Sequence, residues 1–150
     1  MKKVMKDVRQ VSFVVKDLEA TLKYYEEVFG IQEWQRFEIG DHNLEQLPHF
    51  TRGKQIPFAF KGAKAYIGRL EFEFMQPISG DSIYMEFLKE HGPGFHHVFA
   101  EVDNFDEAVE ELKKEYPVML EAITPMGFKV YYFDSFKELG YAIEIGMKQK

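Results

Sequence analysis

Hydrophobic residues in the first part of the chain follow first a strand spacing and then a helix spacing. Residues 8–15 (VRQVSFVV) are rich in β-branched side chains, which predicts a strand. Four apolar residues then recur at helical spacing: Leu18, Leu22, Tyr25 and Phe29. Asp17 is placed to cap this helix and Gly30 to end it. Residues 31–39 return to an extended pattern.

A long polar segment interrupts the pattern. Residues 40–57 (GDHNLEQLPHFTRGKQIP) contain two prolines and two glycines, so we predict a loop with His42 and His49 at the surface. Loops of this length in compact domains are often functional. Two strands are predicted after it, at residues 59–67 and 70–75, joined by a turn at Gly68 and Arg69. Pro77 is expected to end the second strand, and residues 81–90 are expected to form a short helix.

The same succession of elements then begins again. Residues 95–102 predict a strand, Asn104 a helix cap, and a helical stripe follows at Phe105, Ala108, Val109 and Leu112. Further strands are expected at residues 118–123, 128–133 and 141–145. Setting Gln10 against His97 aligns the two halves as an internal repeat of order βαβββ, with the 40–57 segment inserted in the first. We therefore predict one domain over residues 1–150, with module 1 at about 6–77, a connecting helix at 81–91 and module 2 at about 94–147.

Side chains alternate across a strand, so each predicted strand has one apolar face and one face with polar residues. Glu73 shares a face with Glu71, opposite three apolar side chains, and Glu144 lies opposite Ile143 and Ile145. The same alternation places Phe95, His97, Phe99 and Glu101 on one face of their strand and His96 on the other, and it places Gln10 with Ser12.

If the polar faces line a hollow in the sheet, four side chains converge there: Gln10, Glu73, His97 and Glu144. Unpaired carboxylates in such a hollow would cost several kcal/mol each, and a divalent cation removes that cost because it requires ionised ligands. Other interpretations remain open: a solvent-facing sheet face for Glu71 and Glu73, and a capping or core pair for His96 and His97. The repeat favours the metal interpretation, because Gln10 and His97 lie on the first strand of each module, and the two glutamates on the last.

Composition excludes several classes of function. The net charge of −6 argues against nucleic acid as a partner, and the absence of cysteine excludes disulfides, thiolate metal sites and cysteine nucleophiles. No apolar stretch is long enough for a signal peptide or a membrane span, so we expect a cytoplasmic protein that does not enter a membrane. The 15 Phe and 8 Tyr predict an aromatic core or pocket, with Phe58, Phe60, Phe99 and Phe128 as candidate lining residues.

Two segments carry a family resemblance. KDLEATLKYYEEVFGI resembles the opening helix of the glyoxalase, bleomycin-resistance and extradiol-dioxygenase (vicinal-oxygen-chelate) superfamily. LEFEFMQPISGDSIYMEFLKEHGPGFHHVFAEVDNFDEAVEEL is similar to methylmalonyl-CoA epimerases, which have a Pro after a Glu-bearing strand and a G-x-H-H motif. The resemblance covers nearly the whole chain outside residues 40–57. It implies an α+β fold in which two tandem βαβββ modules form a cupped, mostly antiparallel eight-stranded sheet with helices outside.

The resemblance also implies a metal site. It assigns Gln10, Glu73, His97 and Glu144 as ligands of one divalent ion, and this donor set suits Zn, Co, Ni, Mn or Fe(II). Related epimerases often have histidine as the first ligand, where this chain has Gln10. The Gln, Glu, His, Glu set resembles that of eukaryotic-type glyoxalase I enzymes, and it makes dioxygenase chemistry less suitable because it lacks two histidines.

The implied chemistry is removal of a proton beside a carbonyl, by a metal-dependent isomerase or lyase acting on a small 2-oxo compound or an acyl thioester. Glu144 is the expected base, with Glu73 second. An epimerase needs a second proton-transferring group; Glu101 is a candidate, although a solvated strand-end carboxylate is the alternative. Residues 51–70 contain no Asp or Glu.

Two further interpretations remain. The chain is alternatively a non-catalytic small-molecule binding protein of the bleomycin-resistance type, or a domain whose metal site is vestigial.

A local basic excess is formed by Arg52, Lys54, Lys61 and Lys64, which either holds an acidic substrate or the phosphates of CoA, or is a solvated loop face. By analogy with relatives, we expect a homodimer.

Overall fold

The computed structural model describes residues 3–40, 43 and 47–149. The first half of the chain forms β1 (Asp7–Val14), α1 (Leu18–Phe29), β2 (Gln35–Ile39), β3 (His49–Thr51), β4 (Phe58–Ile67) and β5 (Leu70–Gly80). Helix α3 (Ile83–His91) leads to the second half, which forms β6 (Gly94–Glu101), α4 (Phe105–Lys113), β7 (Val118–Ile123), β8 (Phe128–Phe133), α5 (Phe136–Leu139) and β9 (Ala142–Lys148).

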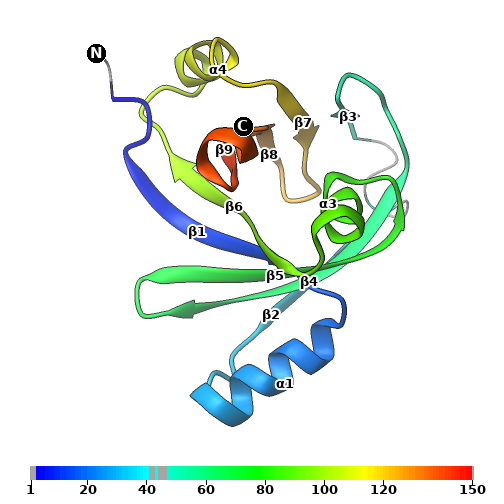
Figure 1. Cartoon of the computed structure of the whole chain (residues 1–150). Coiled ribbons are helices and arrows are strands. Elements are labelled where there is room, and N and C mark those ends of the chain that lie inside the picture. The colour runs from blue at the N-terminus through cyan, green and yellow to red at the C-terminus, as the bar shows by residue number, and fades with distance from the viewer. Residues whose placement is uncertain (1–2, 41–42, 44–46, 150) are drawn as a thin grey trace.

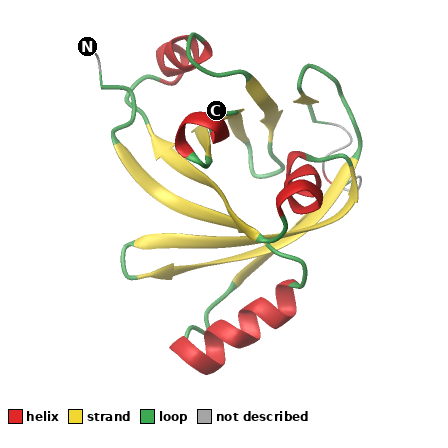
Figure 2. Ribbon diagram, in the orientation of Figure 1, coloured by secondary structure: helices red, strands yellow, loops and turns green. Residues whose placement is uncertain are grey.

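All the described strands belong to one curled sheet, in the order β2-β4-β5-β1-β6-β9-β8-β7-β3 (Figures 1 and 2). Strands β1 and β5 pair in parallel, as do β6 and β9, and the remaining pairs are antiparallel. The antiparallel pairing of β1 with β6 joins the two halves of the chain. The predicted α+β class and cupped sheet are confirmed, but the described residues contribute nine strands and not eight.

The ninth strand comes from the segment predicted to be a loop. Strand β3 pairs with β7, with His49 opposite Ala122. The side chain of His49 is buried and meets the ring of Phe58 edge-on, so the expectation of a surface histidine was wrong. Polar composition did not reveal this pairing, because the partner strand lies about seventy residues away. The other histidine of the segment, His42, lies outside the described residues.

The predicted helix ends are confirmed. The Asp17 side chain accepts a hydrogen bond from the backbone N–H of Ala20, and Asn104 does the same for Glu107. Gly30 ends α1 in the left-handed conformation, with a φ of 72°. Helix α1 packs on the outer face of β4 and β5, and α4 packs on β8 and β9 at the other end of the molecule (Figure 1).

Strand β5 continues through Pro77 to Gly80, beyond its predicted end. Proline has no N–H to donate, so it is tolerated where a neighbouring strand has ended. The pairing of β1 with β5 stops at Met75, so at Pro77 the edge of β5 that faced β1 is no longer paired with it. The sequence alone did not show where β1 would end relative to β5.

Two β-bulges interrupt the pairing of β1 with β6. Ser12 lies opposite His97 but Phe13 lies opposite Phe95, so β6 has His96 as an extra residue. The prediction that strict alternation places Phe95 with His97 was therefore wrong: the Phe95 ring contacts Phe13 on the outer face. The bulge also brings the side chain of His96 beside that of His97.

A second bulge, in β1, brings Arg9 and Gln10 to the same hollow. Val8 lies opposite Ala100 and Gln10 opposite Phe99, which leaves Arg9 as the extra residue. Both Arg9 and Gln10 line the cavity described below. The bulge in β1 thus adds the charged Arg9 to a hollow from which strict alternation would have turned it away.

Gly80 is the position where an added side chain is expected to disturb this fold most. Its φ is 80°, and a Cβ would lie 2.2 Å from the backbone oxygen of Pro57 and 2.7 Å from Cα of Phe58. We expect Gly80→Ala to lower the free energy of unfolding by about 3 kcal/mol or more, because backbone atoms must move. Urea denaturation of the metal-free protein measures this loss.

Gly140 provides the matched control. Its φ is 81°, but nothing lies within 4 Å of a Cβ there. Gly140→Ala therefore carries only the left-handed backbone penalty, about 1–2 kcal/mol. Equal losses in the two variants would contradict the close approach of β5 to the start of β4.

Candidate functional site

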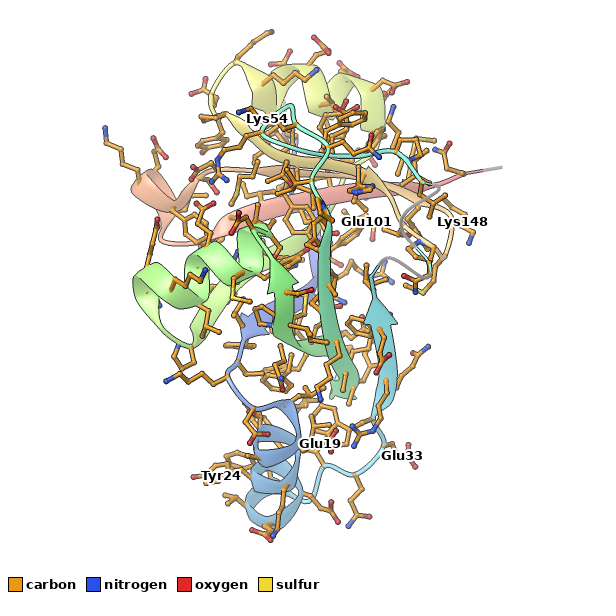
Figure 3. The ribbon with its side chains drawn as sticks, turned by 90° about the vertical axis from the view of Figure 1, so that its right-hand side faces the viewer. Glu19, Tyr24, Glu33, Lys54, Glu101 and Lys148 are labelled. Atoms are coloured by element: carbon orange, nitrogen blue, oxygen red, sulfur yellow. The ribbon has the colours of Figure 1, made fainter. Side chains whose placement is uncertain are left out.

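The hollow of the sheet contains a cavity of about 400 Å³. Its walls are mostly apolar and include all four aromatic residues suggested from the sequence: Phe58, Phe60, Phe99 and Phe128. One end of it is polar, with Gln10, Glu71, Glu73 and Glu144 among its lining residues. In Figure 3 the labelled Glu101, another lining residue, lies between the α1 end of the molecule, marked by Glu19 and Tyr24, and the α4 end.

The four predicted ligands come together at this polar end. His97 is fully buried beneath the cavity floor, and its Nε2 lies 3.3 Å from Oε1 of Glu144 and 3.9 Å from Oε1 of Glu73. The hydroxyl of Ser12 links Glu73 to the fourth predicted ligand, Gln10. It lies 2.8 Å from Oε1 of Glu73 and 3.3 Å from Oε1 of Gln10. The amide nitrogen of Gln10 donates to Glu71 at 2.7 Å.

Sheet pairing explains why these distant residues meet. The central strands β1 and β6 each pair in parallel with the last strand of their own half, which places Ser12 beside Glu73 and Phe99 beside Glu144. The antiparallel pairing of β1 with β6 then places Ser12 opposite His97. Two parallel pairs joined across one antiparallel pair bring one glutamate to each side of His97.

Burial makes these glutamates hard to ionise. Removal from water, with repulsion from Glu144 as the next cause, raises the pKa of Glu73 to about 7. Burial raises the pKa of Glu144 to about 8, against the opposing effects of a hydrogen bond from Tyr132 and the charge of Lys64. Two carboxylates in one desolvated site are therefore unfavourable unless a cation or protons compensate them.

The histidine between them is neutral. Burial lowers the pKa of His97 to about 3, because the charged imidazolium is disfavoured away from water. Its Nδ1 lies 2.8 Å from Nδ1 of His96, so one of these two nitrogens carries a hydrogen and donates a hydrogen bond to the other. A neutral imidazole with Nε2 directed at two carboxylates has the chemistry of a metal ligand.

Comparison with known proteins identifies the family. The family model of the Glyoxalase/Bleomycin resistance protein/Dioxygenase superfamily matches residues 9–132. The chain belongs to this superfamily. The resemblance found in the sequence is thereby confirmed, and the matched residues include Gln10, Glu73 and His97.

Methylmalonyl-CoA epimerases are prominent among the relatives of this superfamily member. The chain is 31% identical to the mitochondrial methylmalonyl-CoA epimerase of Bos taurus over 109 residues, which cover 72% of this chain and 53% of that protein. The corresponding identity with the Homo sapiens protein is 28%, over the same shares of the two chains. The chain thus spans about half the length of these curated relatives.

Solved structures agree in fold. The methylmalonyl-CoA epimerase of Mycobacterium tuberculosis superposes with a TM-score of 0.65 at 16% identity, covering 100% of this chain and 93% of that one. A variant of the Streptomyces coelicolor enzyme in complex with 2-nitronate-propionyl-CoA superposes with a TM-score of 0.66 at 16% identity, covering 97% and 99%. At this identity the likeness establishes the shared fold, and the reaction has to be inferred from the residues of the site.

The donor set fits the divalent ion that is typical of the superfamily. Two ligands that bind one ion at about 2.0–2.2 Å lie roughly 3.0–3.5 Å apart. The distance of 3.3 Å between His97 and Glu144 falls in this range, whereas the 3.9 Å between His97 and Glu73 exceeds it. Accordingly, no three His, Asp or Glu side chains within the described part of the chain already form a ligand cluster. Glu73 and Gln10 must turn from Ser12 and Glu71 to complete one.

Of the predicted basic group, only one member faces the cavity. Lys64 lines it, whereas the guanidinium of Arg52 makes two hydrogen bonds to Glu86 of α3, at 2.7 and 2.8 Å. Lys54 and Lys61 do not line the cavity. The alternative of a solvated loop face thus fits Arg52 and Lys54, which are exposed, whereas Lys61 is half-buried on β4 and Lys64 faces the cavity.

The structure adds site residues that the sequence did not suggest. The sequence places Ser12 only beside Gln10 on its strand and does not single out Arg9, Tyr84 or Tyr132. Arg9 binds Glu101 by an ion pair, so the proposed second acid is already engaged. Tyr84 and Tyr132 are buried on the cavity wall. The one signal in the sequence that could have found Tyr132 is its position on the inner face of a predicted strand, which is the same signal that pointed to Glu144.

Proposed function

We propose that this chain is a metal-dependent isomerase that removes and returns a proton at the carbon beside the carbonyl of an acyl-CoA thioester. The observation that carries the proposal is the placement of Glu73 and Glu144 on either side of the buried His97, at the polar end of a cavity with apolar walls. Such a site combines ligands for a cation with a carboxylate that accepts a proton.

The relatives support this substrate class. The curated proteins to which the chain is similar are methylmalonyl-CoA epimerases, and one structure of similar fold holds methylmalonyl-CoA. The cavity volume and its aromatic walls suit the acyl portion of a thioester, and Lys64 supplies a positive charge inside the cavity. No helix among the described residues is long and apolar enough to cross a membrane.

We assign roles to the site residues on this basis. Gln10, Glu73, His97 and Glu144 hold the divalent ion, which when bound polarises the substrate carbonyl and stabilises the negative charge on its oxygen. Glu144 accepts the proton from the α-carbon, with Glu73 as the second candidate for this step. A proton must then reach the opposite face of that carbon from a second acid, for which Glu101 of the cavity wall is the candidate. The apolar walls exclude water, which keeps the electrostatic interactions of the site strong.

A second candidate reaction has an observation of its own in its favour. Gln10 occupies the first ligand position, and a Gln, Glu, His, Glu set resembles that of lactoylglutathione lyases of the eukaryotic type. The same carboxylate chemistry would move a proton between adjacent carbons of the hemithioacetal of a small 2-oxo compound. Sequestration of a small molecule without reaction is the non-catalytic alternative.

Further features belong to the same proposal. We propose a single domain over residues 1–150 with modules at about 6–77 and 94–147 connected by the helix at 81–91, a homodimer, and a cytoplasmic location. The metal is one of Zn, Co, Ni, Mn or Fe, as the oxygen and imidazole donors suggest.

Solvent exchange tests the proposed reaction. In D2O, the metal-loaded protein is expected to introduce deuterium at the α-carbon of methylmalonyl-CoA at least about 100-fold faster than the chelator-treated protein, because positioned proton transfer contributes this much or more. Mass spectrometry of the recovered thioester measures the uptake, and readdition of the metal is the control.

Three outcomes separate the candidate functions. Uptake into thioesters alone supports the isomerase, whereas conversion of hemithioacetals alone supports the lyase. Absence of exchange across a panel of thioesters and hemithioacetals, in protein with one bound metal ion, would contradict both and favour the binding protein.

A further inference from the structure

Two buried tyrosine hydroxyls lie at the wall of the candidate site. Tyr84 comes from α3 and Tyr132 from β8, and their side chains are only 2% and 5% exposed. The two hydroxyl oxygens lie 2.9 Å apart. Buried hydroxyls are costly unless they are hydrogen-bonded, and phenylalanine would fill the same space without that cost. The pair therefore calls for an explanation beyond packing.

The hydrogen bonds of this pair have a direction. The Tyr132 hydroxyl oxygen lies 3.5 Å from Nε2 of His97, which is itself 3.3 Å from Oε1 of Glu144, and hydrogen bonding from Tyr132 is the largest effect that opposes the raised pKa of Glu144. Glu144 must be ionised to bind a cation, and an ionised carboxylate is the strongest acceptor within reach, so in the metal-binding state the single proton of the Tyr132 hydroxyl points to Glu144. The proton between the tyrosines must then come from Tyr84, which donates to Tyr132.

The surroundings hold this arrangement rigid. The ring of Tyr84 is packed by those of Phe60 and His96, at centroid distances of 4.8 and 5.2 Å. The ring of Tyr132 meets that of His97 edge-on at 4.8 Å. Because the ring is already fixed, its hydroxyl loses little conformational entropy when it makes its hydrogen bond.

We propose that Tyr84 and Tyr132 are positioning residues, with Tyr84 orienting the hydroxyl of Tyr132 and Tyr132 holding the carboxylate of Glu144 beside His97 for a divalent cation. The inference rests on the proposed role of Glu144. It extends the site from the four ligands to a chain of hydrogen bonds that begins on α3. Partners of this kind fix the orientation of a ligand, and their loss typically weakens metal binding by about 10–100-fold.

Metal affinity of single and double variants tests the proposal. Zn²⁺ is titrated against a chelating indicator for the wild type and for Tyr132→Phe, Tyr84→Phe and the double variant. Tyr132→Phe is expected to weaken Zn²⁺ binding by about 10–100-fold. Tyr84→Phe is expected to weaken it by less, about 3–10-fold, because it acts only through Tyr132. The double variant should then bind as Tyr132→Phe does.

Tyr131→Phe is the matched control. Tyr131 is the neighbour of Tyr132 on β8, but its hydroxyl lies 2.7 Å from Glu121, and its ring packs with Phe105 of α4 on the other face of the sheet. Its removal is expected to leave Zn²⁺ affinity within about twofold of the wild type. Thermal unfolding of the metal-free variants shows whether each is folded, and the visible spectrum of the Co²⁺ form reports any change at the metal itself.

The outcomes distinguish this inference from the proposed function. The positioning role would be overturned by unchanged Zn²⁺ affinity in Tyr132→Phe or by an equal loss of affinity in Tyr131→Phe. It would also be overturned if the loss in the double variant equalled the product of the two single losses. A wild type that binds no Zn²⁺ would overturn it as well. Dependence of metal affinity on the tyrosine pair together with no proton exchange would support the inference and contradict the proposed reaction.

Discussion

Glu144→Gln is expected to remove both tight metal binding and proton exchange. Glutamine preserves the shape of the side chain, but it lacks the charge that compensates a divalent cation and the oxygen that accepts a proton. The neighbours of Glu144 make the loss severe, because His97 Nε2 lies 3.3 Å away and Tyr132 donates to its carboxylate. We expect the exchange rate to fall by at least about 1,000-fold, within the range attributed to a positioned base.

Two measurements check this prediction. Mass spectrometric metal analysis after gel filtration is expected to fall from about one ion per chain to near none. Deuterium uptake into methylmalonyl-CoA, at saturating added metal, then reports the loss of the base itself. A variant that keeps both its metal and more than about a tenth of the exchange rate would rule out Glu144 as ligand and base.

Glu121→Gln is the control for this charge removal. Glu121 lies on β7 and accepts a hydrogen bond from Tyr131 at 2.7 Å, outside the cavity. We expect its exchange rate and metal content to remain within about twofold of the wild type, because it is not near His97. A comparable loss in both variants would point to a general effect of net charge.

The metal-free protein is expected to lose stability as the pH rises through neutrality. The folded-state pKa values of Glu73 and Glu144, about 7 and about 8, lie above their ordinary value of 4.5. The native state therefore holds more protons than the unfolded state, and stability falls as the pH rises through these values. His97, whose pKa of about 3 lies below its ordinary 6.5, acts in the opposite sense, and its contribution is lost as the pH falls below about 6.5.

The informative window lies where the histidine contribution no longer changes with pH and the glutamates still titrate, from about pH 6.5 to 8. Roughly one extra proton on the native state corresponds to a loss of about 1 kcal/mol per pH unit in the free energy of unfolding. Urea denaturation in the presence of a chelator measures it. The Glu73→Gln/Glu144→Gln double variant is expected to abolish the slope.

Metal binding is expected to show the opposite pH dependence. Protons on Glu73 and Glu144 must leave before the carboxylates bind a cation, so Zn²⁺ affinity should rise on average by about tenfold per pH unit over the same window. Stability that is independent of pH in the metal-free protein, together with pH-independent Zn²⁺ affinity, would show that the two glutamates are ionised without metal.

The elements with a local signal were predictable. The repeat of apolar positions located helices α1 and α4, and their caps Asp17 and Asn104 were identified because capping depends on residues within one turn. Alternation along single strands correctly placed Glu73 and Glu144 on the inner face, since the period of a strand is local. The resemblance of the G-x-H-H segment to known relatives then selected His97.

The features that depend on long-range pairing were not predictable. Strand β3 exists because it pairs with β7, and β5 passes Pro77 because β1 has already ended. The bulges in β1 and β6 depend on how these two strands meet, and they decide that Arg9 joins the cavity and that His96 lies beside His97. None of these pairings can be predicted from the residues of one strand alone.

By itself, the sequence determined the order of the elements other than β3, the inward positions of Glu73 and Glu144, and the identities of the four candidate ligands. Only the tertiary structure decided how far apart those ligands lie, that Ser12 connects Gln10 to Glu73, and that Tyr84 and Tyr132 bond beside Glu144. The physical reason is that periodicity and capping are set by neighbours along the chain. Hydrogen bonds, burial and pKa shifts in the cavity are set by groups that only the completed sheet brings together.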